Sequence, residues 1–281
     1  MDARTLAAVI LTVVSWASAF AGIRAGLAAY SPAHVALLRY AVAAVALAIY
    51  AGAVRMPLPR LRDLPGLALL GAVGISFYNI ALSFGQQQVP AGTASFLVAS
   101  APVWMALLCR DRLRPWGWAG IALSFAGVGV IALGKRGGVQ LNLHAVVVLV
   151  AALAQATYSL GQKPYLQRYS PLQTTSYAIW AGALLLLPFG GGLPHAISTA
   201  PWSATAAVIY MGIVPGALGY LTWSYALSRL PAVTAGSFLY VIPVFALLIA
   251  WGWLGELPSL LSVGGGALVI GGVILTTTTR N

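Results

Sequence analysis

The chain has 281 residues, of which 60% are hydrophobic and only 7% are charged. A soluble domain carries about 25% charged residues, and a disordered chain is poor in apolar residues, so both classes are excluded. The 15 basic and 4 acidic residues give a net charge of +11, but the basic residues are scattered in short clusters between apolar runs. This pattern excludes a nucleic-acid partner and predicts an integral membrane protein surrounded by the lipid bilayer.

Ten apolar runs are long enough for membrane helices, since about 20 residues cross the hydrocarbon layer. They cover residues 5–23, 32–51, 65–84, 91–109, 115–134, 143–161, 171–189, 203–226, 231–253 and 258–278. The loops between them are short, so the sequence predicts one all-α integral membrane unit. The first run is also compatible with a cleaved signal peptide, because Ala17-Ser18-Ala19 resembles a cleavage site.

The basic residues are distributed unequally between the two sides of the predicted spans. Eleven lie on one side: Arg4, Arg55, Arg60, Arg62, Arg110, Arg112, Arg114, Lys163, Arg168, Arg229 and Arg280. Three lie on the other side: Arg24, Lys135 and Arg136. Because basic loops stay in the cytoplasm, this asymmetry predicts that both termini are cytoplasmic.

The two halves of the chain resemble each other. Residues 89–94 match residues 230–235 at an offset of 141, and Tyr30-Ser31-Pro32 matches Tyr169-Ser170-Pro171 at an offset of 139. We therefore divide the chain into repeats at 1–139 and 140–281, each with five spans. An odd number of spans forces the second repeat to enter the membrane from the opposite side, which predicts the inverted repeat of many secondary transporters. Chance similarity among helices rich in Ala, Gly and Leu is the alternative.

Glycines recur every seven residues in the fifth and tenth spans, at Gly120, Gly127 and Gly134 and at Gly264 and Gly271. Small residues in such stripes let helix backbones approach closely. These two helices are therefore predicted to form a scaffold within the chain or the face of a homodimer.

Two prolines occupy equivalent positions in the repeats, Pro102 in the fourth span and Pro243 in the ninth. Each removes a backbone hydrogen bond and can kink its helix. The kinks are predicted to be gating hinges or purely structural bends.

All four acids, Asp2, Asp63, Asp111 and Glu256, lie outside the predicted hydrocarbon layer. Proton-coupled carriers usually keep a carboxylate inside the membrane, so this placement argues against a proton-driven drug pump. No paired acids, metal-ligand cluster or nucleophile motif accompanies them. We therefore expect no catalytic residue, no metal site and no cofactor.

Neutral polar and aromatic residues remain inside the spans. Ser76, Asn79 and Ser83 form one helical stripe, and Tyr220 is the repeat partner of Asn79. Such faces turn toward the bundle interior or a water-filled cavity, and interhelical hydrogen bonding or packing is the alternative for each residue. The candidate substrate-binding residues are Trp16, Ser18, Arg39, Tyr78, Asn79, Ser83, Trp104, Gln155, Tyr158, Tyr220 and Tyr240.

Arg39 is the one charge predicted inside a span, about 10 Å deep at 1.5 Å per residue. A buried charge of this kind is costly and marks a functional site by default. Two interpretations remain open: Arg39 attracts a substrate carboxylate, or it snorkels to the surface and caps neighbouring carbonyls.

Several short motifs resemble the EamA-domain carriers of the drug/metabolite transporter superfamily. They are Trp16-Ala17-Ser18-Ala19-Phe20, Arg24, Ser31-Pro32, Leu38-Arg39 and Leu254-Gly255-Glu256. The resemblance covers the whole chain and implies a bacterial inner-membrane protein that exports amino acids or other metabolites. The wealth of Trp and Tyr is similar to that of the aromatic amino-acid exporters. The first repeat departs from the pattern, because Asp111-Arg112 stands where the second has Gly255-Glu256.

Together these features favour a carrier that exports amino acids or similar small solutes by alternating access through a neutral cavity, in a uniport-like mode. A proton-coupled exporter of drugs or nucleosides is the alternative within the same class. An intramembrane enzyme and a channel are the alternatives from other classes.

Overall fold

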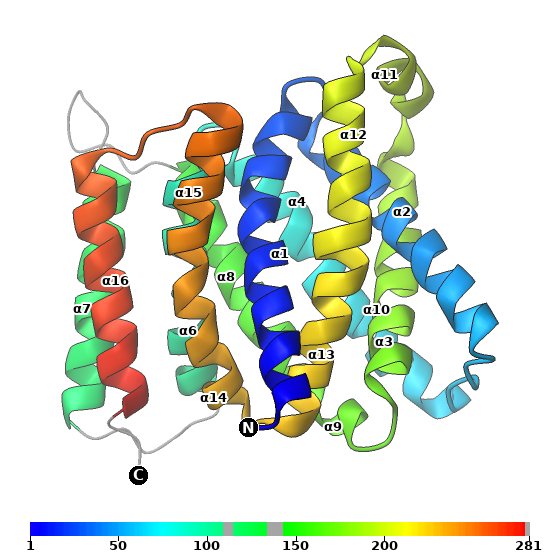
Figure 1. Cartoon of the computed structure of the whole chain (residues 1–281), viewed down its shortest axis with the longest axis horizontal. Helices are drawn as coiled ribbons and strands as arrows, with labels where there is room; N and C mark the ends of the chain where they lie inside the picture. The colour runs from blue at the N-terminus through cyan, green and yellow to red at the C-terminus, as the bar shows by residue number, and fades with distance from the viewer. Residues whose placement is uncertain (109–114, 134–142, 279–281) are drawn as a thin grey trace.

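The computed structural model describes residues 1–108, 115–133 and 143–278, and every regular element in these ranges is helical. The helices pack into one bundle, and α1 begins at the same end of the bundle at which α16 ends (Figure 1). Cys109, Asp111, Arg112, Gly134, Lys135 and Arg136 lie outside the described residues.

The first half contains α1 (Ala3–Leu27), α2 (Pro32–Ala53), η1 (Leu61–Asp63), α3 (Leu64–Gly71), η2 (Ala72–Phe77), α4 (Tyr78–Gly85), α5 (Ala91–Val98), α6 (Ala101–Leu108) and α7 (Pro115–Leu133). The second half contains α8 (Leu143–Gly161), α9 (Lys163–Leu166), α10 (Pro171–Leu186), η3 (Leu187–Gly190), α11 (Leu193–Thr199), α12 (Trp202–Met211), η4 (Gly212–Leu218), α13 (Gly219–Arg229), α14 (Ala232–Ser237), η5 (Phe238–Val241), α15 (Ile242–Leu254) and α16 (Leu260–Thr278). Eight helical stretches in the described ranges are long and apolar enough to cross a membrane. The chain is therefore a multi-pass membrane protein.

The same helix irregularities occur in both halves. The π-helical turns η2 and η4 interrupt the predicted third and eighth spans, and η4 contains Pro215. Proline lacks the amide hydrogen that an α-helix needs, which accounts for the second of these turns. The predicted fourth and ninth spans are also discontinuous, because a turn at Ala99 and Ser100 separates α5 from α6, and η5 separates α14 from α15.

The prolines of the fourth and ninth spans lie just after these breaks. Pro102 is the second residue of α6, and Pro243 is the second residue of α15. The first turn of a helix leaves its amide hydrogens unbonded, so a proline there costs nothing. The α-helix is thus broken by a turn just before Pro102 and by a 3-10 segment just before Pro243.

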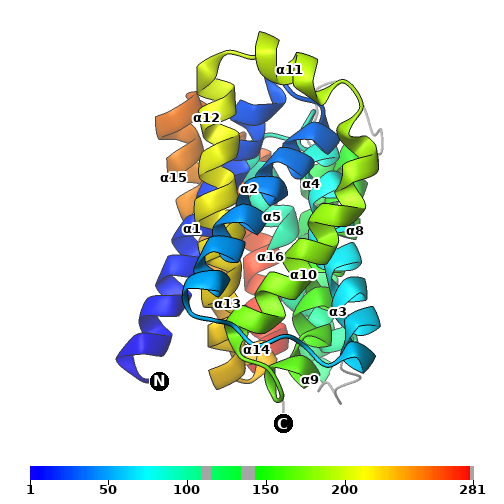
Figure 2. The same cartoon turned by 90° about the vertical axis from the view of Figure 1, so that its right-hand side faces the viewer.

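Matching residues cap the helix that forms the second span of each half, α2 and α10. The Ser31 side chain accepts a hydrogen bond from the amide of His34, and Ser170 accepts one from the amide of Gln173, each at 3.2 Å. A proline follows each serine at the first helical position, the arrangement expected for a helix start. The two helices that they begin, α2 and α10, lie side by side (Figure 2).

Two basic residues cap the C-termini of helices at opposite ends of the bundle. Arg24 Nη1 donates to the carbonyl of Gln86 at 2.8 Å, beyond the end of α4. Lys163 Nζ donates to the carbonyls of Leu227 and Leu230 at 2.7 and 2.8 Å, at the end of α13. α4 and α13 end at opposite ends of the bundle (Figure 1). Cations are favourable at both places, because unpaired carbonyls collect at helix C-termini.

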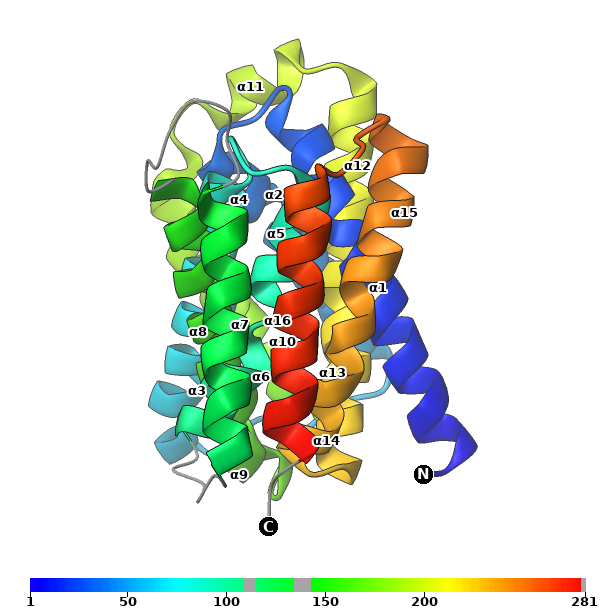
Figure 3. The ribbon, with the colours of Figure 1, turned by 90° about the vertical axis from the view of Figure 1, so that its left-hand side faces the viewer.

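Helices α7 and α16 pack against each other within the chain (Figure 3). A Cβ atom at Gly127 would meet the backbone of Gly265, and one at Gly272 would meet the backbone of Gly120. Ser124 Oγ adds a hydrogen bond to the carbonyl of Val269 at 3.2 Å. Gly120 and Gly127 therefore take part in an internal scaffold, but they meet Gly265 and Gly272 rather than the predicted Gly264 and Gly271, whose Cβ positions face open space. The homodimer face stays a prediction.

Candidate functional site

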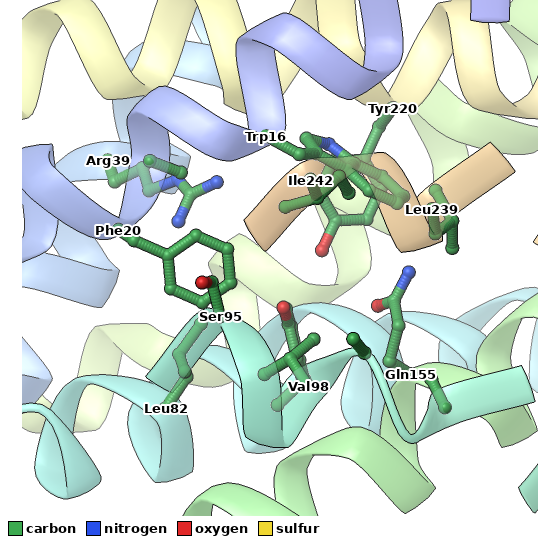
Figure 4. Close-up of a pocket in the computed structure, with 14 residues that line it drawn as sticks. Trp16, Phe20, Arg39, Leu82, Ser95, Val98, Gln155, Tyr220, Leu239 and Ile242 are labelled. Atoms are coloured by element: carbon green, nitrogen blue, oxygen red, sulfur yellow. The ribbon is translucent and has the colours of Figure 1, made fainter. Parts of the chain in front are cut away.

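A pocket lies between helices of both halves, near the breaks described above (Figure 4). Five of the predicted site residues line it: Trp16, Arg39, Tyr78, Gln155 and Tyr220. The remaining wall consists of Ala19, Phe20, Leu82, Ser95, Val98, Ala99, Ala101, Leu239 and Ile242. The cavity volume is about 30 Å³, and one water needs roughly 10–15 Å³. In this conformation the pocket has room for a few waters.

The pocket wall repeats itself across the two halves. Val98 and Leu239 are 141 residues apart and stand at the two helix breaks, as Ala101 and Ile242 do. Trp16 and Gln155 are equivalent at an offset of 139. The repeats thus contribute matching backbone positions to one shared cavity.

Tyr220 is the centre of an aromatic cluster beside the pocket. Its ring centroid lies 5.2 Å from that of Trp16, 5.7 Å from that of Tyr158 and 6.1 Å from that of Tyr40, all in edge-on geometry. Such edge-on pairs stabilise their contact by about 0.5–1.5 kcal/mol beyond burial. The cluster joins α1, α2, α8 and α13 into one wall.

Glycines make room for this cluster. A Cβ atom at Gly74 would overlap the ring of Tyr158, and one at Gly219 would lie 2.8 Å from Trp16 Nε1. The π-helical turns also supply acceptors, since Tyr220 donates its hydroxyl to the carbonyl of Gly74 at 3.2 Å and Trp16 Nε1 donates to that of Pro215 at 3.3 Å. The irregular turns therefore hold the aromatic wall in place.

Arg39 is buried, with 3% of its surface exposed, and its guanidinium faces the pocket (Figure 4). Its Nη1 donates to Asn79 Oδ1 at 3.0 Å, and the Asn79 amide is oriented by donation from Nδ2 to the carbonyl of Ile75 at 2.9 Å. The guanidinium carbon also lies 5.2 Å from the ring centroid of Tyr40. Asn79 thus holds Arg39 in position and stands behind the pocket wall.

Gln155 presents its amide to the pocket from α8, on the other side from Arg39 (Figure 4). It is 3% exposed, and neither its Oε1 nor its Nε2 has a hydrogen-bond partner in the part of the chain that the structure describes. Buried polar atoms are normally paired, so this amide is available for a solute or for water.

Six predicted site residues lie outside the wall of this pocket: Ser18, Asn79, Ser83, Trp104, Tyr158 and Tyr240. Ser18 hydrogen-bonds Tyr210 at 2.8 Å, and the ring of Trp104 packs edge-on against Phe125 at 5.4 Å. Ser83 and Tyr240 are both buried. Ser18 therefore makes an interhelical hydrogen bond and Trp104 a packing contact, which are the two alternatives to cavity lining that the sequence left open.

Sequence reasoning did not select the apolar lining residues or Ser95. The spacing of Trp16, Ala19 and Phe20 at i, i+3 and i+4 would have placed Ala19 and Phe20 on the face of Trp16. Ser95 directly follows the repeated segment 89–94, and its counterpart at the same offset is Gly236, so the repeat does not single it out.

An ion-pair network lies one helical turn beyond the pocket. Glu256 Oε1 pairs with Arg24 Nε at 3.0 Å, and Glu256 Oε2 accepts the amide of Ala91 at 3.0 Å. Arg24 is four residues beyond the lining residue Phe20. This network, which the sequence analysis did not predict, joins α1 and the start of α5 to the segment after α15.

Comparisons with known proteins agree with this arrangement. Residues 3–133 and 142–278 each match the EamA-like transporter family. The "Probable terminal-alkyne amino-acid exporter" of Streptantibioticus cattleyicolor is 45% identical over 95% of this chain and 91% of its own length. The "Uncharacterized transporter YdfC" of Bacillus subtilis is 38% identical over 95% of this chain and 88% of its own. A crystal structure at 20% identity superposes with a TM-score of 0.67 and covers 100% of this chain and 98% of its own.

Proposed function

This chain belongs to the EamA-like transporter family, and we propose that it is a secondary carrier that exports amino acids or similar small metabolites. It is a transporter rather than an enzyme. The observation that carries the proposal is the pocket between the repeats, which combines an apolar and aromatic wall with one buried cation and one unpaired amide.

The proposed architecture has ten membrane helices in two inverted five-helix repeats. The two family matches, the equivalent π-helical turns and helix breaks, and the basic caps at opposite ends of the bundle support it. The ten spans are the eight apolar stretches together with α7 and α16, which have 19 residues each. An interface between inverted repeats is where secondary transporters place their substrate.

The names of two relatives support the solute class. One is the terminal-alkyne amino-acid exporter, and the other is the "Probable amino-acid metabolite efflux pump" of Salmonella typhimurium, 26% identical over 95% of this chain. A small amphipathic zwitterion also matches the chemistry of the pocket, because aromatic faces and aliphatic side chains suit its apolar part.

The transport mechanism that we propose is alternating access without proton coupling. The pocket is too small for an amino acid in this conformation, so the helices around it must separate to admit one. The breaks at Ala99 and Ser100 and at η5 lie on the pocket wall and are suited to such a movement. No acid lines the pocket within the described ranges, so it has no carboxylate to carry a coupled proton.

The proposed location is the bacterial inner membrane with both termini in the cytoplasm. The support for this orientation is the distribution of basic residues, eleven against three. A homodimer through α16 is also proposed, since Gly264 and Gly271 have open space where a Cβ atom would lie. Crosslinking of the purified protein in lipid tests this contact.

Counterflow in proteoliposomes tests the proposed function. Vesicles loaded with an unlabelled amino acid are expected to accumulate the labelled form, and the rate should be the same with and without an imposed pH gradient. Strict dependence on the gradient would overturn the uniport mechanism. Exchange of nucleosides or cationic drugs with no exchange of any amino acid would overturn the solute class.

A further inference from the structure

The charge of Arg39 has no counter-ion in the part of the chain that the structure describes. Asp63 is engaged by the Tyr169 hydroxyl at 2.6 Å and by Arg168 at 3.1 Å. Glu256 pairs with Arg24. The guanidinium of Arg39 contacts two neutral side chains, Asn79 and Tyr40.

One nitrogen of this guanidinium is also unused. Nη1 donates to Asn79, but Nε is buried and has no hydrogen-bond partner among the described residues. A buried unpaired cation is costly, and a buried donor without an acceptor adds to that cost. The snorkelling interpretation does not fit, because a snorkelling side chain keeps its charged group in water and this one is 3% exposed.

The cation also breaks the symmetry of the pocket. At the repeat offset of 139 residues, the position equivalent to Arg39 is Ala178, which has no charge. The pocket therefore has a positive side at Arg39 and a neutral side at Gln155 (Figure 4). An asymmetric solute with an anionic end and an uncharged body would bind in one orientation.

We propose that Arg39 is the binding site for the carboxylate of the transported solute. A guanidinium is a planar fork of donors that matches a carboxylate, and the bound anion would supply the missing counter-charge. This inference rests on the proposed function and narrows it: the carrier selects solutes with a free carboxylate over their amides, esters and decarboxylated amines.

The test compares each amino acid that the wild type exchanges with its own carboxamide, which keeps the size and the ammonium group but lacks the anion. The wild type is expected to show a KM at least tenfold lower for the acid. Arg39→Gln should raise the KM of the acid at least tenfold and change that of the carboxamide less than threefold. Gly52→Ala, where the added Cβ meets open space, is the control and should alter neither KM.

Asn79→Asp is a second variant with a side chain of the same size, which gives up the donation from Nδ2 to the carbonyl of Ile75. The new carboxylate would lie where Oδ1 now accepts from Arg39 at 3.0 Å, so it would neutralise the cation from behind the wall. The KM of the acid should rise at least tenfold with little change for the carboxamide. Equal KM values for acid and amide in the wild type, or an equal rise of both in the variants, would overturn the proposal.

A binding measurement separates this proposal from the proposed function. Isovalerate, but not isovaleramide, should raise the Tm of the wild-type protein in detergent, and Arg39→Gln should abolish the shift. If vesicles exchange no amino acid while this shift is observed, the export function fails and the carboxylate site stands. If exchange occurs and neither acid nor amide shifts the Tm of the wild type, the site fails and the export function stands.

Discussion

Gly71→Val is expected to lower the Tm of the protein in detergent by about 10 °C. A Cβ atom at this position would lie 2.7 Å from the backbone nitrogen of Gly182 and would overlap the carbonyl oxygen of Ala178, both in α10. Backbone atoms cannot move aside as a flexible side chain can. Overpacking costs about 1–3 kcal/mol, and a contact against backbone belongs at the top of that range, which corresponds to a fall of about 6–12 °C.

The contact is reciprocal, which strengthens this expectation. A Cβ atom at Gly182 would meet Ile75 and the carbonyl of Gly71, and Ser76 Oγ donates to the carbonyl of Gly182 at 2.9 Å. The Gly71→Val variant would therefore move both α3 and η2 away from α10.

Gly52→Ala is the matched control for Gly71→Val. Gly52 lies near the end of α2 with open space around its Cβ position, so alanine should leave the Tm unchanged or raise it slightly. Equal Tm values for the wild type and the Gly71 variant would show that α3 and α10 do not pack as closely as described.

Local and periodic features were predictable from the sequence. The matched serines, Ser31 and Ser170, were found from the repeat alone, and both cap helices in the structure. Arg39 was identified as a buried charge, and it is buried. A helix start depends on residues within one turn, and a charge within a long apolar run is carried into the membrane with that run, so both features can be recognised in the sequence.

The shape of the pocket was not predictable. Ser18 and Gln155 look alike in the sequence, as polar residues within spans, but Ser18 bonds another helix and Gln155 faces the pocket. Lining residues such as Val98 and Leu239 are apolar and cannot be distinguished from lipid-facing residues by composition. The choice between cavity and packing depends on contacts between distant segments, such as Arg24 with Glu256, which are 232 residues apart.

Glu256→Gln is expected to open one end of the pocket. The carboxylate holds Arg24 of α1 and the amide of Ala91 at the start of α5, and both side chains of the ion pair are partly shielded, with 31% and 22% exposed. A partly exposed ion pair is worth at most about 1 kcal/mol, whereas a hydrogen bond to a charged acceptor is worth about 1.5–3 kcal/mol. The loss of this ion pair and hydrogen bond should raise the ratio of the open to the closed conformation about tenfold or more.

Cysteine labelling measures this opening. The chain has a single cysteine, so a Cys109→Ser background with Ser95→Cys places one thiol on the pocket wall. A membrane-impermeant thiol reagent added on the side where α1 ends should label it about tenfold faster once Glu256→Gln is introduced.

Asp2→Asn is the control, since Asp2 caps the start of α1 at the opposite end of the bundle by accepting from the amide of Thr5 at 2.9 Å. It should leave the labelling rate unchanged. If Glu256→Gln also leaves the rate unchanged, the Arg24–Glu256 network does not close the pocket, and the closure must then come from the side chains that lie nearer to the cavity, Phe20 on α1 and Leu82 on α4.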